Sequence, residues 1–294
     1  MVIVRLTGGL GNQMFQYAAA RAVADRLGAE LLLDTRAFEH ALALRPYTRR
    51  AYALAPFRLR ARLANTQDLR GWPLWVIEVG ARLRMARPLF RRWHFETGTA
   101  YDPAVRALRK PAFLVGYWQS ARYFNEIAAR IRADFTLRQP LAGANIGLLE
   151  LARSGSSVGL HVRRGDFANL DPAARMHGLC SVEYYRRAIG MLRERFPDCR
   201  FLVFSDDLDW ARAALPLDTS AQIATGNIER PEQDLALMSA CKHHIIANSS
   251  FSWWAAWLGE HPEQMVIAPT PWYASTKLDA RDLAVARWHY ISRV

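Results

Sequence analysis

No run of apolar residues in this sequence is long enough to cross a lipid bilayer. The longest stretches, such as residues 73–77, end at a charged residue well short of the roughly 18 apolar residues that indicate a membrane-spanning helix. The amino terminus lacks the charged and apolar regions of a signal peptide, because residues 2–6 run directly into glycines. We therefore expect a cytoplasmic protein whose fold begins at residue 1.

Cysteine is scarce, and Cys180, Cys199 and Cys241 are the only three in the chain. Their odd number and the absence of C-x-x-C spacing predict neither a disulfide framework nor a zinc site. A reducing compartment such as the cytoplasm fits this pattern best.

Lysine is nearly absent, since it occurs only at positions 110, 242 and 277, and arginine carries nearly all of a formal net charge of +12. That charge suits nucleic acid, an anionic membrane surface or a nucleotide diphosphate. Arginine favours the last, because its guanidinium forms bidentate contacts with phosphate. A nucleic-acid-binding module stays an alternative without a recognisable motif, and a compositional bias towards arginine and alanine explains most individual arginines.

The amino-terminal residues predict a strand, a glycine turn, a helix and a second strand, at residues 2–6, 7–11, 14–27 and 30–33. Gly9 and Gly11 after the first strand, with Asp34 ending the second, are similar to a dinucleotide fingerprint. An NAD-dependent oxidoreductase is therefore an alternative, but Met14 stands where that fingerprint needs glycine or alanine. A turn that serves only tight packing of strand on helix is a further alternative.

Strands and helices alternate more regularly in the second half of the chain. The expected strands are residues 157–162, 200–204, 244–247 and 265–268, and the expected helices are residues 148–153, 182–196, 208–214, 231–240 and 251–259. This alternation predicts a parallel sheet covered on both faces. A segment with proline and glycine at 139–147 marks a domain boundary. We predict an α/β protein with two Rossmann-like domains, residues 1–147 and 148–294, that face a cleft.

The first candidate motif follows the strand at residues 157–162 and contains His161, Arg163, Arg164 and Asp166. Successive side chains of a strand point to opposite faces. One arginine is therefore expected to contact phosphate, while the other pairs with an acid such as Asp166. The alternative is a solvated cluster of charges at the end of a strand.

The second motif is Ser205, Asp206 and Asp207, which follows the next strand. Two carboxylates could bind a divalent metal ion, or they could accept hydrogen bonds from a base or a ribose, which we favour. Asp207 could also simply cap the helix that follows it.

The third motif runs from Asn248 through Ser249 and Ser250 to Phe251, where a strand gives way to an aromatic helix. The amino end of that helix would offer N–H donors to a phosphate, although either serine could be a plain N-cap. The helix's tryptophans have the spacing of core residues: Trp253, Trp254 and Trp257. All three motifs end strands of the same half, so one nucleotide diphosphate could reach them together.

These motifs resemble those of the α-1,2-fucosyltransferases of glycosyltransferase family 11. Residues 161–166 match the family's His-x-Arg-Arg-x-Asp signature, residues 204–207 match its acidic motif, and residues 234–254 resemble its third block. In the first half, residues 8–17 and 116–120 are also similar to family segments. The basic segment 70–93 has no match.

The resemblance implies a GT-B fold and inverting transfer of L-fucose from GDP-β-L-fucose to the 2-hydroxyl of a galactose, with no metal ion or other cofactor. Arg163 and Arg164 would stabilise the diphosphate leaving group, and Asp166 and His161 are candidates for the general base. The residues expected to bind the donor are Gly9, Gly11, Asn12, Gln13, Ser205, Asp206, Asp207, Asn248, Ser249, Ser250 and Phe251.

The resemblance also suggests the partners. The first domain would bind a galactose-containing oligosaccharide or a lipid-linked glycan, in bacterial surface polysaccharide biosynthesis. Residues 70–93 could contact an anionic inner membrane, with ordinary core packing as the alternative. The acceptor itself is not predicted by the sequence.

Overall fold

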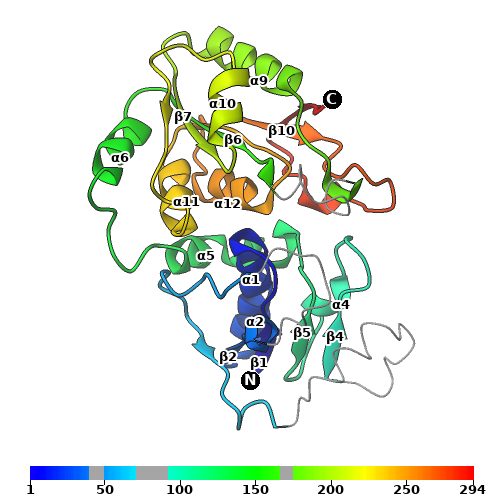
Figure 1. Cartoon of the computed structure of the whole chain (residues 1–294). Helices are drawn as coiled ribbons and strands as arrows, with labels where there is room; N and C mark the ends of the chain where they lie inside the picture. The colour runs from blue at the N-terminus through cyan, green and yellow to red at the C-terminus, as the bar shows by residue number, and fades with distance from the viewer. Residues whose placement is uncertain (40–49, 71–91, 166–174) are drawn as a thin grey trace. The chain divides into compact units, whose positions relative to one another are not determined.

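A computed structural model describes residues 1–39, 50–70, 92–165 and 175–294 of the chain (Figure 1). The chain forms two compact units. The first comprises Met1–Thr136 and Arg281–Leu283, and the second comprises Leu137–Ala280 and Ala284–Val294. The second unit thus begins before the predicted junction at residues 147 and 148, because the helix α6 (Asn145–Arg153) packs on α11 (Pro231–Ser239) of that unit.

The first unit is built on a five-stranded sheet with the order β3-β2-β1-β5-β4, in which every pair of neighbours is parallel. The strands are β1 Val2–Arg5, β2 Leu31–Asp34, β3 Arg62–Leu63, β4 Trp93–Phe95 and β5 Phe113–Val115. The predicted strand, turn, helix and strand at the amino terminus are confirmed, with the helix α1 (Leu10–Leu27) starting earlier than expected.

The first unit also contains several short helices and turns. They are α2 Arg36–Glu39, α4 Pro103–Arg106, α5 Ala128–Asp134 and the 3₁₀ turns η1 Ala121–Tyr123, η2 Asn125–Ile127 and η3 Arg281–Leu283. Gly28 ends α1 in the left-handed conformation, with φ of 57°, which glycine adopts at little cost. The apolar residues of β1 and β2 are buried, as expected for strands covered on both faces.

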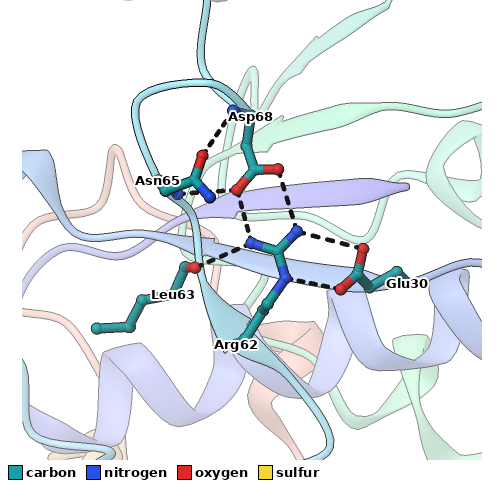
Figure 2. A network of polar contacts seen from close by, with 5 residues as sticks. All are labelled: Glu30, Arg62, Leu63, Asn65 and Asp68. Carbon is teal, nitrogen blue, oxygen red and sulfur yellow. Dashed lines mark hydrogen bonds and ion pairs between the residues drawn. The ribbon is translucent and has the colours of Figure 1, made fainter.

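An ion-pair network holds the short edge strand β3 to the sheet. Figure 2 shows the guanidinium of Arg62 between the carboxylates of Glu30 and Asp68, with N–O distances of 2.7 and 2.6 Å. Asp68 also accepts a hydrogen bond from the backbone N–H of Asn65. The network supports a strand of only two residues, which has few ladder hydrogen bonds of its own.

The second unit contains a six-stranded sheet with the order β11-β10-β9-β6-β7-β8, again with every neighbouring pair parallel. The strands are β6 Ser157–Val162, β7 Arg200–Ser205, β8 Gln222–Ile223, β9 His243–Ile245, β10 Val266–Thr270 and β11 His289–Ser292, and the remaining helices are α9 Val182–Arg195, α10 Leu208–Ala214 and α12 Ser250–Leu258. All four predicted strands are present, whereas β8 and β11 were not predicted.

The central strand β6 shows why this sheet needs cover on both faces. Val158, Leu160 and Val162 pack into one core cluster with the apolar side of α9. On the opposite face, Gly159 leaves room for α11, because a Cβ there would lie 2.9 Å from the Cγ of Met238. The tryptophans of α12 are buried, which confirms the packing role expected from their spacing.

Across the described ranges, no helix combines the length and the apolar character required to span a membrane.

Candidate active site

The sheet of the second unit brings the three sequence motifs together. In its strand order, β9, β6 and β7 are direct neighbours, and all run in the same direction. Val162 pairs with Ser205 at the carboxyl ends of β6 and β7. The arginines after β6 therefore lie beside the aspartates after β7, at the edge where parallel α/β sheets bind ligands.

Arg163 and Arg164 pair with the two aspartates one to one. Arg163 Nη1 lies 2.8 Å from Asp206 Oδ2, and Arg164 Nε lies 3.0 Å from Asp207 Oδ2. All four side chains are partly buried, so solvent screens these pairs less than it screens fully exposed ones. The acidic partners come from the neighbouring strand, whereas the predicted partner Asp166 lies outside the described residues.

The backbone locks Asp206 into this arrangement. Its Oδ1 accepts a hydrogen bond from the backbone N–H of Arg164 at 2.8 Å. A Cβ on Gly165 would lie 2.5 Å from Asp206 Oδ2, so only glycine allows the chain to pass so close to this carboxylate. The position of Arg163 thus depends on both Asp206 and Gly165.

Asp207 has two roles, one of which is the predicted alternative of a helix cap. Its Oδ1 accepts from the backbone N–H of Trp210 at 3.1 Å at the start of α10, while its other oxygen pairs with Arg164. Its own N–H donates to Ser205 Oγ at 2.9 Å. The Arg164 guanidinium lies 4.3 Å above the centre of the Trp210 ring, a cation–π contact that the sequence analysis missed.

His161 is buried in β6, and its ring lies 5.3 Å from the ring of Phe251, measured between centroids. Burial, followed by the nearby charge of Arg163, lowers the pKa of His161 to about 3. Its Nδ1 is buried without a hydrogen-bond partner in the described structure. The imidazole is therefore neutral near pH 7 and too weakly basic to be an effective general base.

The third motif forms the amino end of α12. Ser249 is the N-cap, and its Oγ accepts from the backbone N–H of Phe251 at 3.4 Å, as the N-cap alternative predicted. Ser250 and Phe251 are half-buried in the first turn. The helix dipole places a partial positive charge at this end, beside His161 at the end of β6.

Asn248 positions the surrounding loops. Its buried amide nitrogen donates to the carbonyl oxygens of His177, Gly178 and Trp272, at 2.9 to 3.1 Å. Its carbonyl oxygen accepts from the thiol of Cys180 at 3.6 Å. The side chain therefore ties three loops together, and its predicted contact with the donor stays a prediction.

The polar side chains beside the glycine turn of the first unit form hydrogen bonds within the protein. Gln13 is buried and donates to the carbonyl oxygens of Gly8 and Ala51, while its own oxygen accepts from the N–H of Ala53. Asn12 accepts from Gln119 at 2.9 Å. Gln13 thus holds the turn in place, and donor binding by the four residues predicted here, Gly9, Gly11, Asn12 and Gln13, stays a prediction.

Asp34 gives no support to the dinucleotide alternative. Its buried carboxylate pairs with Arg36 Nε at 2.8 Å and accepts a second bond from the same guanidinium at 3.0 Å. An acid that binds the ribose of NAD must instead offer its oxygens to the ligand. Among the described residues, no group of three or more His, Cys, Asp or Glu side chains is placed to hold a metal ion.

Comparisons with known proteins identify the family and several relatives of this chain. Residues 98–292 match the family model described as Glycosyl transferase family 11. The chain is 34% identical to the alpha-1,2-colitosyltransferase of Escherichia coli, over 100% of this chain and 99% of that protein. It is 30% identical to the human galactoside alpha-(1,2)-fucosyltransferase 1, over 85% of this chain and 63% of that protein.

Solved structures show the same fold at low sequence identity. The fucosyltransferase NodZ from Bradyrhizobium has a TM-score of 0.51 and 16% identity, covering 87% of this chain and 91% of that one. This similarity confirms the predicted α/β fold of the GT-B type. The match to the family model and the close relatives favour the transferase over the oxidoreductase and nucleic-acid alternatives. The protein belongs to glycosyltransferase family 11.

Proposed function

We propose that the protein transfers L-fucose from GDP-β-L-fucose to the 2-hydroxyl of a galactose in a glycan acceptor, with inversion. The observation that carries this proposal is the joint placement of Arg163, Arg164 and the amino end of α12 at adjacent strand ends. Relatives named as alpha-1,2-colitosyltransferase and galactoside alpha-(1,2)-fucosyltransferase support the linkage and the class of acceptor.

The paired arginines suit the leaving group of this reaction. As the bond to the sugar breaks, negative charge develops on the diphosphate, and fixed cations stabilise it without reorganising. Arg164 uses Nε for Asp207, and within the described structure its terminal nitrogens make no hydrogen bond or ion pair. Its remaining N–H groups can therefore donate to a phosphate, while Asp207 and Trp210 fix the plane of the guanidinium.

Deprotonation of the attacking hydroxyl is assigned to Asp166 as the candidate base, because the low pKa of His161 makes it a poor one. Asp166→Asn should be inactive whether the carboxylate is the base or only orients an arginine. Rescue by a small exogenous anion such as azide separates these roles, since an anion can replace a base but not an orienting side chain.

We propose that no metal ion takes part. Asp206 and Asp207 follow β7 beside the two arginines, and both are already paired with arginine. The first experiment is a thermal-shift measurement of the chelator-treated protein with GDP, GDP-fucose, UDP-sugars and NAD. Stabilisation by the two guanine nucleotides alone is expected, and transfer that requires added Mg²⁺ or Mn²⁺ would contradict metal independence.

The donor has one specific competitor. The relative at 34% identity is named a colitosyltransferase, and colitose is L-fucose without its 3-hydroxyl. Initial rates with GDP-L-fucose and GDP-L-colitose at equal concentration, with the product linkage read by NMR, decide between them. If kcat/KM is at least tenfold higher for GDP-colitose, the donor is GDP-colitose and not GDP-fucose. The proposed linkage is unchanged by that outcome.

The cytoplasmic location stays a prediction. The contact of residues 70–93 with a membrane also stays a prediction, because residues 71–91 lie outside the described part of the chain. Co-sedimentation with anionic vesicles, compared with neutral vesicles, tests the contact directly. If a variant whose arginines in this segment are replaced no longer binds the vesicles, the segment makes the membrane contact.

A further inference from the structure

A turn of unusual backbone conformation follows β5 in the first unit. We call residues 116–119 the aromatic turn, after Tyr117 and Trp118. Trp118 has φ of 55° and is the one non-glycine residue with positive φ among those that the structure describes. A bulky side chain rarely adopts this conformation unless its surroundings impose it.

Glu96 imposes this conformation from the end of the neighbouring strand β4. Its Oε2 accepts from the backbone N–H of Tyr117 at 2.7 Å, and its Oε1 accepts from the backbone N–H of Trp118 at 2.8 Å. Burial raises the pKa of Glu96, although these two bonds oppose the shift. One carboxylate thus clamps two consecutive peptide groups.

Gly116 is needed for the clamp to form. A Cβ at this position would lie 2.3 Å from the Cβ of Glu96 and 3.0 Å from its Oε2. Any side chain here would push Glu96 away from the turn. Gly116 and Glu96 therefore both act on the aromatic turn, and together they accompany the positive φ of Trp118.

The clamp divides the two aromatic side chains of the turn. The indole of Trp118 is fully buried and meets the ring of Tyr123 edge-on, at 5.8 Å between centroids. Tyr117 remains 44% exposed, and its backbone N–H is held by Glu96. In the clamped turn, Trp118 is therefore part of the core while the ring of Tyr117 stays at the surface.

The aromatic turn lies where a ligand of this unit would be expected. In the sheet order, β5 stands between β1 and β4, so their carboxyl ends are adjacent. Gln119 Nε2 donates to Asn12 Oδ1 at 2.9 Å and links the turn to the glycine turn after β1. Parallel sheets of this kind bind ligands at their carboxyl edge.

We propose that the aromatic turn, clamped by Glu96, is a subsite for the acceptor galactoside, whose ring stacks on the partly exposed side chain of Tyr117. The assignment of the sugar rests on the proposed function. Galactose suits such a platform, because its axial 4-hydroxyl leaves the C–H groups at C3, C4 and C5 on one apolar face. A rigid aromatic ring at the surface binds such a face with little loss of conformational entropy.

Kinetics of three variants test the stacking. Tyr117→Ala should raise the acceptor KM about tenfold, with GDP-fucose affinity and melting temperature unchanged, whereas Tyr117→Phe should keep the acceptor KM within about threefold. Glu96→Gln should also raise the acceptor KM, because its NH₂ group would face a backbone N–H. Leu63→Ala removes a 48% exposed side chain elsewhere in the same unit and serves as the control.

Saturation-transfer NMR with lactose separates this proposal from the proposed function, because it needs no donor. Wild type should transfer saturation to the galactose H3, H4 and H5 protons, and folded Tyr117→Ala should not. Equal signals in both proteins, no binding by wild type, or an unchanged acceptor KM would overturn the subsite. If fucose transfer fails while lactose binding depends on Tyr117, the proposed donor reaction is wrong and the subsite stands.

Discussion

Gly165 occupies a position where one added methyl group would disturb the candidate site without entering the core. Its Cβ would lie 2.5 Å from Asp206 Oδ2, and Asp206 holds both Arg163 and the backbone of Arg164. Gly165→Ala should therefore lower kcat/KM at least tenfold while the melting temperature changes little. Transfer rates and thermal unfolding of the same preparation check this.

Gly190 supplies the matched control for that substitution. It is exposed within α9, and a Cβ there would meet nothing within 4 Å. Gly190→Ala should raise the free energy of unfolding by about 0.5–1 kcal/mol, because alanine favours the helix and restricts the unfolded chain. Its transfer activity should equal that of wild type. Equal activity of Gly165→Ala would show that the position of Asp206 is unimportant.

The arginines themselves provide the sharpest residue-level prediction. Arg163→Ala and Arg164→Ala should each reduce kcat by about 10²–10³-fold, the usual loss when one fixed donor to developing charge is removed. Arg164→Lys should recover little, because an ammonium group cannot bond Asp207 and stack on Trp210 as the guanidinium does. Arg212→Ala, which breaks the exposed pair with Asp209, is the control and should be silent.

At the scale of elements, Tyr17 joins three segments of the first unit. From α1, its hydroxyl donates to Asp134 Oδ2 of α5 at 2.7 Å and accepts from the backbone N–H of Arg60 at 3.0 Å. Tyr17→Phe removes one hydrogen bond from the buried carboxylate of Asp134 and another from the N–H of Arg60, so the free energy of unfolding should fall by about 1–3 kcal/mol. Denaturant unfolding measures it, and the more exposed Tyr290→Phe should cost less.

The elements that the sequence predicted best are those with a strong local pattern. Residues 157–162 and 208–214 were predicted with the bounds that the structure shows. The strands β3, β8 and β4 have two or three residues each, so no period of alternation can be read from them. They exist because distant strands offer hydrogen bonds at a sheet edge, which is a property of the tertiary fold.

Part of the candidate site could be predicted from the sequence, and part could not. That three motifs would meet at one sheet edge followed from parallel topology alone, and the strand order confirms it. The partners of Arg163 and Arg164 could not be read from spacing, because Asp206 and Asp207 follow a different strand. Likewise, Gln13 was predicted to bind the donor, but its bonds to the loop at residues 51–53 depend on a segment distant in sequence.

At the scale of the whole molecule, buried histidines contribute to the dependence of stability on pH. Burial lowers the pKa of both His161 and His244 to about 3. Gln264 Nε2 donates to Nδ1 of His244 at 3.1 Å, and Nε2 of His244 bonds the carbonyl of Met238 at 2.9 Å. The bond to Met238 raises the pKa, but the larger effect of burial lowers it. In the unfolded chain a histidine gains its proton near pH 6.5, whereas the folded protein resists protonation until about pH 3.

The unfolded state therefore binds more protons throughout that interval, and stability must fall as the pH falls from about 6.5 towards 3. Each such histidine contributes a slope of about 1.4 kcal/mol per pH unit where it is fully protonated only in the unfolded state. His244→Gln should make the slope of unfolding free energy between pH 6 and pH 5 shallower by about that amount. Denaturant unfolding at both pH values measures it, with the exposed His289→Gln as control. An unchanged slope in His244→Gln would mean that the folded protein protonates this imidazole as readily as the unfolded chain does.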